Sequence, residues 1–409
     1  MASINDIRAA FPYFSQGPGA TGYVYLDNAA TTQKPFAVLE AMNQFYIHSC
    51  ANIHRGVHRL SQSASIAFED ARGTTAQYFG VNNPQQIIFT SGATESINLL
   101  AQGLAKSHLK PGDSIMLSVL EHHANFLPWQ EWAHAHQGTL KTLPLTSDFE
   151  IHWPELESHF KSGIALLSIT AVSNTLGIRL PLEQIINMAK RYGVPVCIDA
   201  AQLAAHQNIN LDTLQPDFLV CSAHKLYGPT GTGILYLAPS WLNSLPISKT
   251  GGGAISKVSW EKTEYVDGAL RYEAGTPNIA GVLGFAAALK KLQQWDLATC
   301  EKHEQQCLNY LEQQLIQIPE IIVYAQGKPK IGSLSFNVKG HHAFDVGSFL
   351  DRYQIAVRTG HHCTQPLMTH LNVSGTIRVS VGIYTSQDDI NAFINALKKT
   401  LVHLLKYHA

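Results

Sequence analysis

Lys225 lies in a glycine-rich segment, Ser222–Gly233, between two apolar stretches typical of buried strands, 216–220 and 233–237. Lysine is seldom buried, because an unpaired ammonium group loses its hydration and its pKa falls. A lysine amine with a lowered pKa attacks carbonyl carbon, and enzymes that form Schiff bases use lysine in this way. A surface lysine in a loop between two strands explains this segment equally well. The role of Lys225 therefore depends on its neighbours in the fold.

Asp199 follows a short apolar stretch, Val194–Ile198, that has the character of a buried strand. A buried carboxylate without a partner is costly, so Asp199 needs a cation. An ionised carboxylate can keep a pyridine nitrogen protonated, and a pyridoxal ring needs such a partner to act as an electron sink. Taken singly, an aspartate here more commonly caps the next helix. Gln202 follows three residues later on the same turn.

A turn of small and polar residues, 91–95, joins a predicted strand over 86–90 to a predicted helix over 96–104. Such a turn directs free backbone N–H groups and the start of a helix toward one point, which favours phosphate. It is not a Walker loop, because the lysine and the spacing of that motif are absent. An ordinary turn between a strand and a helix fits the same residues.

Cys363 lies in a loop with several cationic or potentially cationic side chains, 358–364, where a thiolate is favoured. A spare loop cysteine is the alternative, and without the lysine site it is the better interpretation. The six cysteines form no CxxC pair, so they indicate neither a disulfide framework nor a structural zinc site. We expect no metal, and with the lysine site present Cys363 is the candidate nucleophile.

The elements that must position these residues alternate between apolar strands and helices. We expect strands at 23–26, 86–90, 114–119, 164–169, 194–198, 216–220 and 233–237, and helices from Pro35 and at 61–79, 96–104, 181–192 and 279–295. This alternation predicts an α/β fold with right-handed crossovers and a mainly parallel sheet. Polar clusters then gather at the carboxyl edge of the sheet, where open α/β sheets bind ligands.

A different pattern follows the helix at 279–295. Helices are expected at 297–316, 343–353 and 386–407, and strands at 321–324, 332–338, 356–358 and 376–381. Before it, Gly251–Gly253 has the composition of a flexible joint and leads into a polar, alternating stretch over 258–272. We therefore place a domain boundary inside or just after the helix at 279–295.

The composition excludes some classes of partner. A net charge of −1 and a pI near 7.0 leave no basic field, so nucleic acid is not expected. Only 14% of residues are charged and 45% are hydrophobic, which indicates a large buried fraction and an extensive subunit interface. The N-terminus lacks the features of a signal peptide and no apolar run is long enough to span a membrane, so we expect a cytoplasmic protein without membrane contacts.

Several motifs together resemble one family over nearly the whole chain. They are YLDNAATTQKP, NIHRGVH, EHHANFLPWQ, VSNTLG, DAAQ, SAHKLYGPTGTG, EAGTPN and RTGHHCTQPLM. The chain resembles the fold-type I enzymes that use pyridoxal 5'-phosphate (PLP), and within them the class V aminotransferase-like, SufS-like cysteine desulfurases. The resemblance implies a large PLP-binding domain over 23–290 with a seven-stranded sheet. It also implies a smaller α+β domain over 1–22 plus 291–409 that carries the cysteine loop.

The resemblance also implies which residues hold the cofactor. Lys225 matches the Schiff-base lysine, and the others match residues at the pyridine nitrogen (Asp199), the ring hydroxyl (Gln202), the ring face (His122) and the phosphate (Thr94, Ser222, His224 and, across a dimer interface, Thr276). One departure is visible, because Ala93 in the turn SGAT offers the phosphate only its backbone.

For the substrate, the resemblance implies that Asn174 and Arg378 hold the amino-acid carboxylate and that Arg358 lies near the cysteine loop. A planar guanidinium suits bidentate binding of a carboxylate. A structural ion pair is the alternative role of Arg378, which we consider the weaker interpretation from its position in the chain. Cys363 matches the nucleophile that receives the substrate sulfur.

The implied activity is desulfuration of L-cysteine to L-alanine, with a persulfide on Cys363 that supplies iron-sulfur cluster assembly. The implied partners are a second copy of the chain and a small SufE-like or SufU-like sulfur acceptor, because the cysteine loop is short. Alternatives are a selenocysteine lyase, a CsdA-like desulfurase or sulfinate lyase, and a non-catalytic sulfur-relay scaffold. An ordinary transaminase is disfavoured, since it would leave Cys363 idle.

Overall fold

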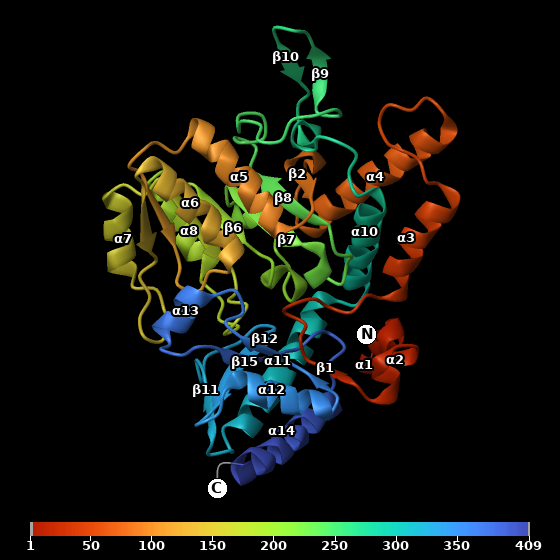
Figure 1. Cartoon of the computed structure of the whole chain (residues 1–409). Helices are drawn as coiled ribbons and strands as arrows, with labels where there is room; N and C mark the ends of the chain where they lie inside the picture. The colour runs from red at the N-terminus through yellow and green to blue at the C-terminus, as the bar shows by residue number, and fades with distance from the viewer. Residues whose placement is uncertain (1–2, 408–409) are drawn as a thin grey trace.

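The chain folds around two main sheets, described for residues 3–407 of the computed structural model (Figure 1). The larger sheet has seven strands in the order β2-β8-β7-β6-β5-β3-β4. These strands are β2 (Ile87–Thr90), β3 (Ser114–Leu117), β4 (Thr139–Thr142), β5 (Leu166–Thr170), β6 (Val196–Asp199), β7 (Phe218–Ser222) and β8 (Gly233–Leu237). Only β8 runs antiparallel to its neighbours, β2 and β7. The predicted α/β class with a mainly parallel sheet is confirmed.

One strand of this sheet was not predicted. β4 lies at the edge, and its residues Thr-Leu-Lys-Thr are mostly exposed. The interior strands are continuous apolar runs because both of their faces are buried, whereas an edge strand needs no such run. The sequence signal that identified the interior strands is therefore absent from β4.

Helices cover both faces of the larger sheet (Figure 1). They include α3 (Phe36–His48), α4 (Arg59–Tyr78), α5 (Ala93–Ser107), α6 (Leu127–His136), α7 (Trp153–Lys161), α8 (Leu182–Arg191), the short α9 (Leu211–Leu214) and α10 (Ile279–Gln294). α10 packs against α3 and α4, and its buried face is rich in alanine and glycine, which allow close approach. Asn278 caps α10 by accepting the backbone N–H of Gly281, so this helix begins where the apolar pattern begins.

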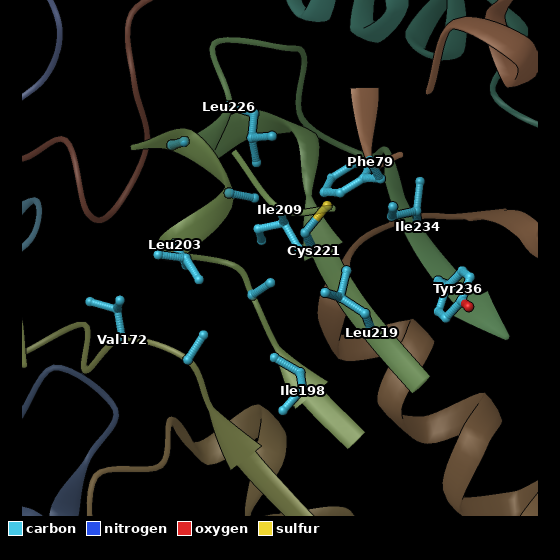
Figure 2. Packing of buried hydrophobic residues seen from close by; sticks show 14 of the residues in the cluster. Phe79, Val172, Ile198, Leu203, Ile209, Leu219, Cys221, Leu226, Ile234 and Tyr236 are labelled. Atoms are coloured by element: carbon cyan, nitrogen blue, oxygen red, sulfur yellow. The ribbon is translucent and has the colours of Figure 1, made fainter. Parts of the chain in front are cut away.

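The two faces of the larger sheet have separate cores. In β3, Met116 packs on one face, whereas Ile115 and Leu117 pack on the other, as the two-residue period of a strand requires. Figure 2 shows part of the first face, where Ile198 of β6 and Leu219 of β7 lie among other apolar side chains. This packing fixes the strand ends from which the polar loops emerge.

The cysteines of the chain are all free thiols. Four of them are buried, namely Cys197, Cys221, Cys300 and Cys307. Burial raises the pKa of the Cys197 and Cys221 thiols, and it raises that of Cys300 and Cys307 to about 12. Cys197 and Cys221 are thus the core thiols that their apolar surroundings predict. Cys50 is exposed and Cys363 is half-buried.

A smaller antiparallel sheet follows α10, with strands in the order β11-β12-β15-β14. These strands are β11 (Ile321–Val323), β12 (Ser333–Val338), β14 (Arg358–Gly360) and β15 (Thr376–Ser380). The helices in this part of the chain are α11 (Leu297–Leu315), α12 (Ala343–Arg352), α13 (Gln365–His370) and α14 (Gln387–Tyr407). In Figure 1, α13 lies where this part of the chain meets the larger sheet.

The N-terminal stretch crosses between the two parts. Its helices are α1 (Ile4–Ala9) and α2 (Pro12–Ser15), and Ile7 and Phe11 pack in a core of the larger sheet. β1 (Val24–Tyr25) instead pairs with β13 (Ile355–Ala356), and Leu26 packs in the core of the smaller sheet. Residues before position 23 thus pack with the larger sheet, and Leu26 after it packs with the smaller sheet. The division into 23–290 and 1–22 plus 291–409 stays a prediction.

The polar stretch after Gly251–Gly253 forms a hairpin of β9 (Ile255–Val258) and β10 (Thr263–Tyr265). The hairpin projects from the top of the molecule in Figure 1 and exposes Trp260 fully. Among residues 3–407, no helix is long and apolar enough to cross a membrane.

Candidate active site

A cavity of about 330 Å³ lies at the carboxyl ends of the parallel strands β5, β6 and β7. Loops from the larger sheet form one side of it, and the segment after β14 contributes Cys363 from the other part of the chain. The residues that were predicted from the sequence and line this cavity are Thr94, His122, Asn174, Asp199, Ser222, His224, Lys225, Arg358, Cys363 and Arg378. The predicted residues that do not line it are Gln202 and Thr276.

Lys225 ends a short 3-10 turn that directly follows β7. Burial lowers the pKa of the Lys225 amine, and the negative charge of Asp199 offsets part of this effect. The same environment therefore favours the neutral, nucleophilic form of the amine that the sequence argument required.

The turn that carries Lys225 is held by hydrogen bonds from Thr32 and Lys34, which the sequence analysis did not predict. The backbone carbonyl of His224 accepts hydrogen bonds from the N–H of Thr32 at 3.0 Å and from Lys34 Nζ at 2.9 Å. Lys34 Nζ also donates to the carbonyl of Thr32, and burial lowers the pKa of Lys34 to about 7. Both residues belong to the motif YLDNAATTQKP, but nothing in the motif indicates a contact with a turn so distant in sequence.

Asp199 lies at the end of β6, opposite Thr170 of β5 in the sheet register. Its Oδ1 accepts the backbone N–H of Ala201 at 2.9 Å, so it also stabilises the following turn. Burial raises the pKa of the Asp199 carboxyl, and the positive charge of Lys225 lowers it. No ion pair to Asp199 is present within residues 3–407. The sequence analysis expected Asp199 to need a cation as partner. In the structure its carboxyl group lines the cavity instead.

The start of α5 meets the end of β7 at another side of the cavity. α5 begins at Ala93, three residues before the predicted start, so the turn SGAT runs directly into the helix. Ser222 Oγ accepts the N–H of Ala93 at 2.8 Å, while Thr94 is exposed toward the cavity. The unpaired N–H groups of a first helical turn attract anions, and His224 adds a ring at the same place.

His122 is held as a neutral imidazole. Its Nδ1 accepts the N–H of Ala124 at 3.0 Å, which leaves the ring proton on Nε2. Burial and the charge of Lys225 lower the pKa of His122 to about 3. A neutral, partly buried ring in this cavity can stack on a planar ligand.

Two predicted cofactor residues lie elsewhere. Gln202 is buried, and its Nε2 donates to the carbonyl of Ala29, a residue that does line the cavity. Thr276 is exposed, and its Oγ1 accepts a hydrogen bond from Asn52 Nδ2 at 3.3 Å in a different region of the surface. Within one chain, Thr276 therefore does not line the cavity.

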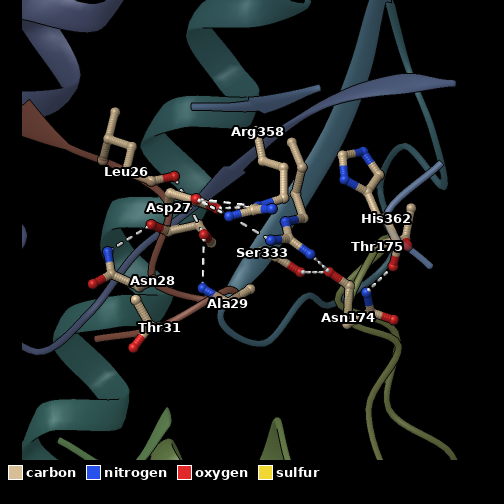
Figure 3. A network of polar contacts seen from close by, with 12 residues as sticks. Leu26, Asp27, Asn28, Ala29, Thr31, Asn174, Thr175, Ser333, Arg358 and His362 are labelled. Carbon is tan, nitrogen blue, oxygen red and sulfur yellow. Dashed lines mark hydrogen bonds and ion pairs between the residues drawn. The ribbon is translucent and has the colours of Figure 1, made fainter. Parts of the chain in front are cut away.

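Two arginines, Arg358 and Arg378, share one carboxylate, that of Asp27, and Figure 3 shows Arg358 beside it. Arg358 contacts both oxygens of Asp27 with Nε at 3.1 Å and one with Nη2 at 2.8 Å, while Arg378 contacts Asp27 with Nη2 at 3.2 Å. Arg378 therefore forms a structural ion pair, which the sequence analysis had considered its less favoured role. However, Arg378 Nε is buried and has no hydrogen-bond partner among the described residues.

Asn174 forms hydrogen bonds with Arg378 and with the backbone of His362. Its backbone carbonyl accepts Arg378 Nη1 at 3.1 Å, and its Nδ2 donates to the carbonyl of His362 at 2.9 Å (Figure 3). The side-chain N–H group that makes this bond thus fixes the chain next to Cys363. The oxygen of the same amide is not used in this contact.

The cysteine segment, residues 361–364, joins β14 to α13 directly. His362 and Cys363 both have left-handed backbone angles, with φ of 52° and 57°. The N–H of Cys363 donates to His361 Nδ1 at 3.1 Å, and the buried His362 ring bonds Thr376 through Nε2. Burial and Arg378 lower the pKa of His362 to about 3. The half-buried Cys363 thus reaches the same cavity as Lys225 on a short, internally bonded segment.

Comparison with known proteins shows the family of the chain. The family model for aminotransferase class-V matches residues 24–393. A cysteine desulfurase of Shigella flexneri is 39% identical over 398 residues, which cover 97% of this chain and 98% of the relative.

Two solved structures are also similar. The apo structure of the cysteine desulfurase from Thermococcus onnurineus NA1 has a TM-score of 0.93 at 34% identity, over 98% of both chains. The cysteine desulfurase CsdA from Escherichia coli has a TM-score of 0.91 at 35% identity, over 98% of this chain and 99% of that one. The chain therefore belongs to the aminotransferase class-V family and, within it, to the cysteine desulfurases.

Proposed function

We propose that this protein is a PLP-dependent cysteine desulfurase that converts L-cysteine to L-alanine and keeps the sulfur as a persulfide on Cys363. One observation carries the proposal: Cys363, Lys225 and Asp199 line a single cavity, although Cys363 comes from a distant part of the chain. The lysine and the aspartate fit an amino-acid chemistry that needs PLP, and the cysteine fits the removal of sulfur.

The cavity has the groups that PLP requires. Asp199 presents a buried carboxyl that forms no ion pair with any residue from 3 to 407, which suits a protonated pyridine nitrogen, and the first turn of α5 with Ser222 suits the phosphate. Lys225 would hold the aldehyde carbon covalently, and the neutral ring of His122 would lie against the cofactor. When bound, PLP withdraws electrons from the Cα of an amino acid attached to it.

The arginines would bind and orient the substrate. Arg378 lines the cavity, its Nε has no hydrogen-bond partner among the described residues, and a carboxylate bound by this guanidinium would add to its hydrogen bonding. Arg358 lies beside it on the same Asp27 carboxylate, and is half exposed. The shared carboxylate keeps both guanidinium groups in place before the substrate arrives, which reduces the ordering cost of binding.

Lys225 and Cys363 would perform the transfers. The lowered pKa of Lys225 lets its amine take the proton from the substrate Cα and return a proton to the product. The Cys363 thiolate attacks the substrate sulfur, so that an S–S bond forms, the substrate C–S bond breaks, and the carbon released takes up a proton. The balance is L-cysteine plus a Cys363 thiol giving L-alanine plus a Cys363 persulfide, with no external oxidant or reductant.

A single-turnover reaction with L-cysteine tests this proposal. We expect the wild-type protein to gain one sulfur atom on Cys363, measured by intact mass, together with an equal amount of alanine. Cys363→Ala should retain PLP but form neither product, whereas Cys50→Ala, at the exposed cysteine, should behave as the wild type. Undiminished release of sulfur from L-cysteine by Cys363→Ala would refute the assignment.

We propose that a second copy of this chain completes the site and that a small SufE-like or SufU-like protein accepts the sulfur, in the cytoplasm, for iron-sulfur clusters. Thr276 would reach the phosphate of the partner's cofactor, since it is exposed and does not line the cavity of its own chain. Exposed apolar side chains on α3 and α4, including Tyr46, Ile47 and Ile66, support an interface there. The short segment around a half-buried Cys363 supports a separate acceptor.

A CsdA-like range of substrates is the second candidate, because the E. coli protein CsdA is 35% identical over 98% of this chain. Turnover of L-cysteine, L-selenocysteine and L-cysteine sulfinate, measured side by side, separates this candidate and a selenocysteine lyase from the main proposal. The presence of Lys225, Asp199 and Cys363 in one cavity speaks against a non-catalytic scaffold.

A further inference from the structure

Each residue from 362 to 365 makes a hydrogen bond to a loop of the larger sheet. The bonds are Asn174 Nδ2 to the His362 carbonyl (2.9 Å), the His123 N–H to the Cys363 carbonyl (2.7 Å), Thr175 Oγ1 with Thr364 Oγ1 (3.0 Å), and the Gln365 N–H to His123 Nε2 (3.2 Å). The position of the cysteine is therefore set by the larger sheet as well as by its own strand. His123 supplies two of these contacts, one on Cys363 itself.

His123 is the second histidine of the motif EHHAN, and neither the sequence analysis nor the proposed mechanism gives it a role. Its Nε2 accepts the N–H of Gln365, the first residue of α13, so Nε2 carries no proton in this arrangement. The other side chains that hold residues 362–365 are an amide and a hydroxyl, which do not titrate. His123 is thus the titratable contact among the four.

The backbone that His123 holds is one that needs support. Two consecutive residues with side chains, His362 and Cys363, adopt the left-handed conformation, which is strained for residues other than glycine. Such a turn persists only when its surroundings fix it. His361 Nδ1 accepts the N–H of Cys363, the backbone N–H of His123 donates to the carbonyl of Cys363, and the His123 ring accepts the N–H of Gln365, so the turn is held on both sides of the cysteine.

The surroundings of His123 keep its ring neutral. Burial lowers the pKa of His123, and the neighbouring His361, whose ring centroid lies 5.7 Å away, lowers it further. His122, on the same loop, is the other titratable group facing it, with ring centroids 6.4 Å apart. A proton on His123 would place two N–H groups against each other at Gln365 and remove the contact.

We infer that His123 is a positioning residue that holds the Cys363 turn through its unprotonated Nε2, so that protonation of His123 releases the nucleophile from its reactive position. The inference rests on Cys363 being the nucleophile of the proposed function. Its test uses alkylation of the Cys363 thiol, which proceeds whether or not the protein desulfurates cysteine. Failure of the inference and failure of the proposed function are therefore distinguishable.

The experiment compares His123→Leu with His123→Gln. Leucine removes the acceptor, whereas the Oε1 of glutamine can take the place of Nε2 but does not titrate. His134→Gln, at an exposed histidine on α6, is the matched control. In a Cys50→Ala background, the rate of Cys363 alkylation by iodoacetamide is followed by intact mass on the PLP-loaded protein, across the pH range in which histidine titrates.

We expect His123→Leu to slow alkylation of Cys363, and the single-turnover formation of persulfide, by about tenfold or more, with the binding of L-cysteine unchanged. The wild-type profile should show a second inflection on the acid side, in addition to that of the thiol. His123→Gln should keep most of the rate and lose this inflection, and His134→Gln should match the wild type.

Two results would overturn the inference. One is equal rates and equal pH profiles for the wild type, His123→Leu and His123→Gln, which would show that the contact does not position Cys363. The other is equal slowing in both variants, which would show that the acceptor on His123 is not what matters. If His123→Leu does not fold, His123→Gln decides, because a retained acid-side inflection in that variant excludes His123 as its origin.

Discussion

At the scale of residues, the carboxylate of Asp27 holds two arginines that line the cavity. Asp27 holds Arg358 and Arg378 at once, and through Arg378 it fixes the donor that would receive the substrate carboxylate. Asp27 supplies one negative charge to two positively charged guanidinium groups, which leaves an excess of positive charge for the carboxylate of the proposed substrate. The pairing also keeps the nearly buried Arg378 from being left as an uncompensated charge.

We expect Asp27→Asn to weaken binding of L-cysteine and to lower the free energy of unfolding by about 3 kcal/mol, because it breaks a buried ion pair and leaves one partner unpaired. The reason for the weaker binding is that both guanidinium groups lose the anchor that orients them. Urea unfolding and a titration with L-cysteine measure the two effects. Asp70→Asn, at an exposed aspartate on α4, removes the same charge as a control. Unchanged stability in Asp27→Asn would contradict the structural role.

Residues at the ends of buried strands were predictable from the sequence, and their distant partners were not. Asp199 and Lys225 follow apolar runs, so the sheet geometry predicts that they meet at one edge. Asp27 also follows an apolar run, but its contacts are with arginines more than 300 positions away. No local pattern reports such a pair, and the ion pair of Arg378 was underrated for this reason.

At the scale of elements, the helix α5 begins earlier in the structure than the sequence predicts. The sequence places its start at 96, because serine, glycine and threonine are poor helix formers and are typical of turns. The structure starts it at Ala93, so Thr94 lies in the first helical turn at the cavity. The positive end of the helix dipole is therefore placed where a phosphate would bind.

This placement predicts opposite effects of Thr94→Asp on two states of the protein. Without PLP, an aspartate in the first turn should leave the melting temperature unchanged or raise it, since it stabilises the helix by about 0.3–1 kcal/mol. With PLP, repulsion between the aspartate and the phosphate should raise the dissociation constant tenfold or more. Fluorescence titration with PLP and thermal unfolding of the cofactor-free protein measure both. A Thr94→Asp protein that binds PLP as tightly as Thr94→Val would argue against a phosphate at this helix.

At the scale of the whole molecule, a buried pair connects the two parts of the chain. His206, in the turns after β6, bonds Glu304 of α11 through Nδ1 at 2.7 Å, and both side chains are almost fully buried. Burial favours the neutral ring of His206, but the charge and hydrogen bond of Glu304 outweigh it and raise the pKa of His206 above its ordinary value. The interface between the two parts therefore contains a hydrogen-bonded pair whose histidine can gain or lose a proton.

The raised pKa of His206 predicts that the free energy of unfolding depends on pH. A raised pKa in the folded protein gives stabilisation that is fully present below the ordinary histidine pKa and is lost as the pH rises through the raised value. We expect the urea midpoint of the wild type to exceed that of His206→Gln more at about pH 6 than at about pH 9. His134→Gln should show no such change. A difference between wild type and His206→Gln that does not vary with pH would contradict the raised pKa, because it would show that folding leaves the pKa of His206 unchanged.

The distribution of thiols gives the fold a further property, which is protection against internal sulfur exchange. A persulfide passes its outer sulfur to thiolates, and burial disfavours the thiolate at Cys197, Cys221, Cys300 and Cys307 by raising their pKa. If Cys363 carries the sulfur, as we propose, none of the four buried thiols among residues 3–407 would compete for it. We therefore expect the sulfur to leave from the solvent side of the cavity, which is the side that a partner protein would approach.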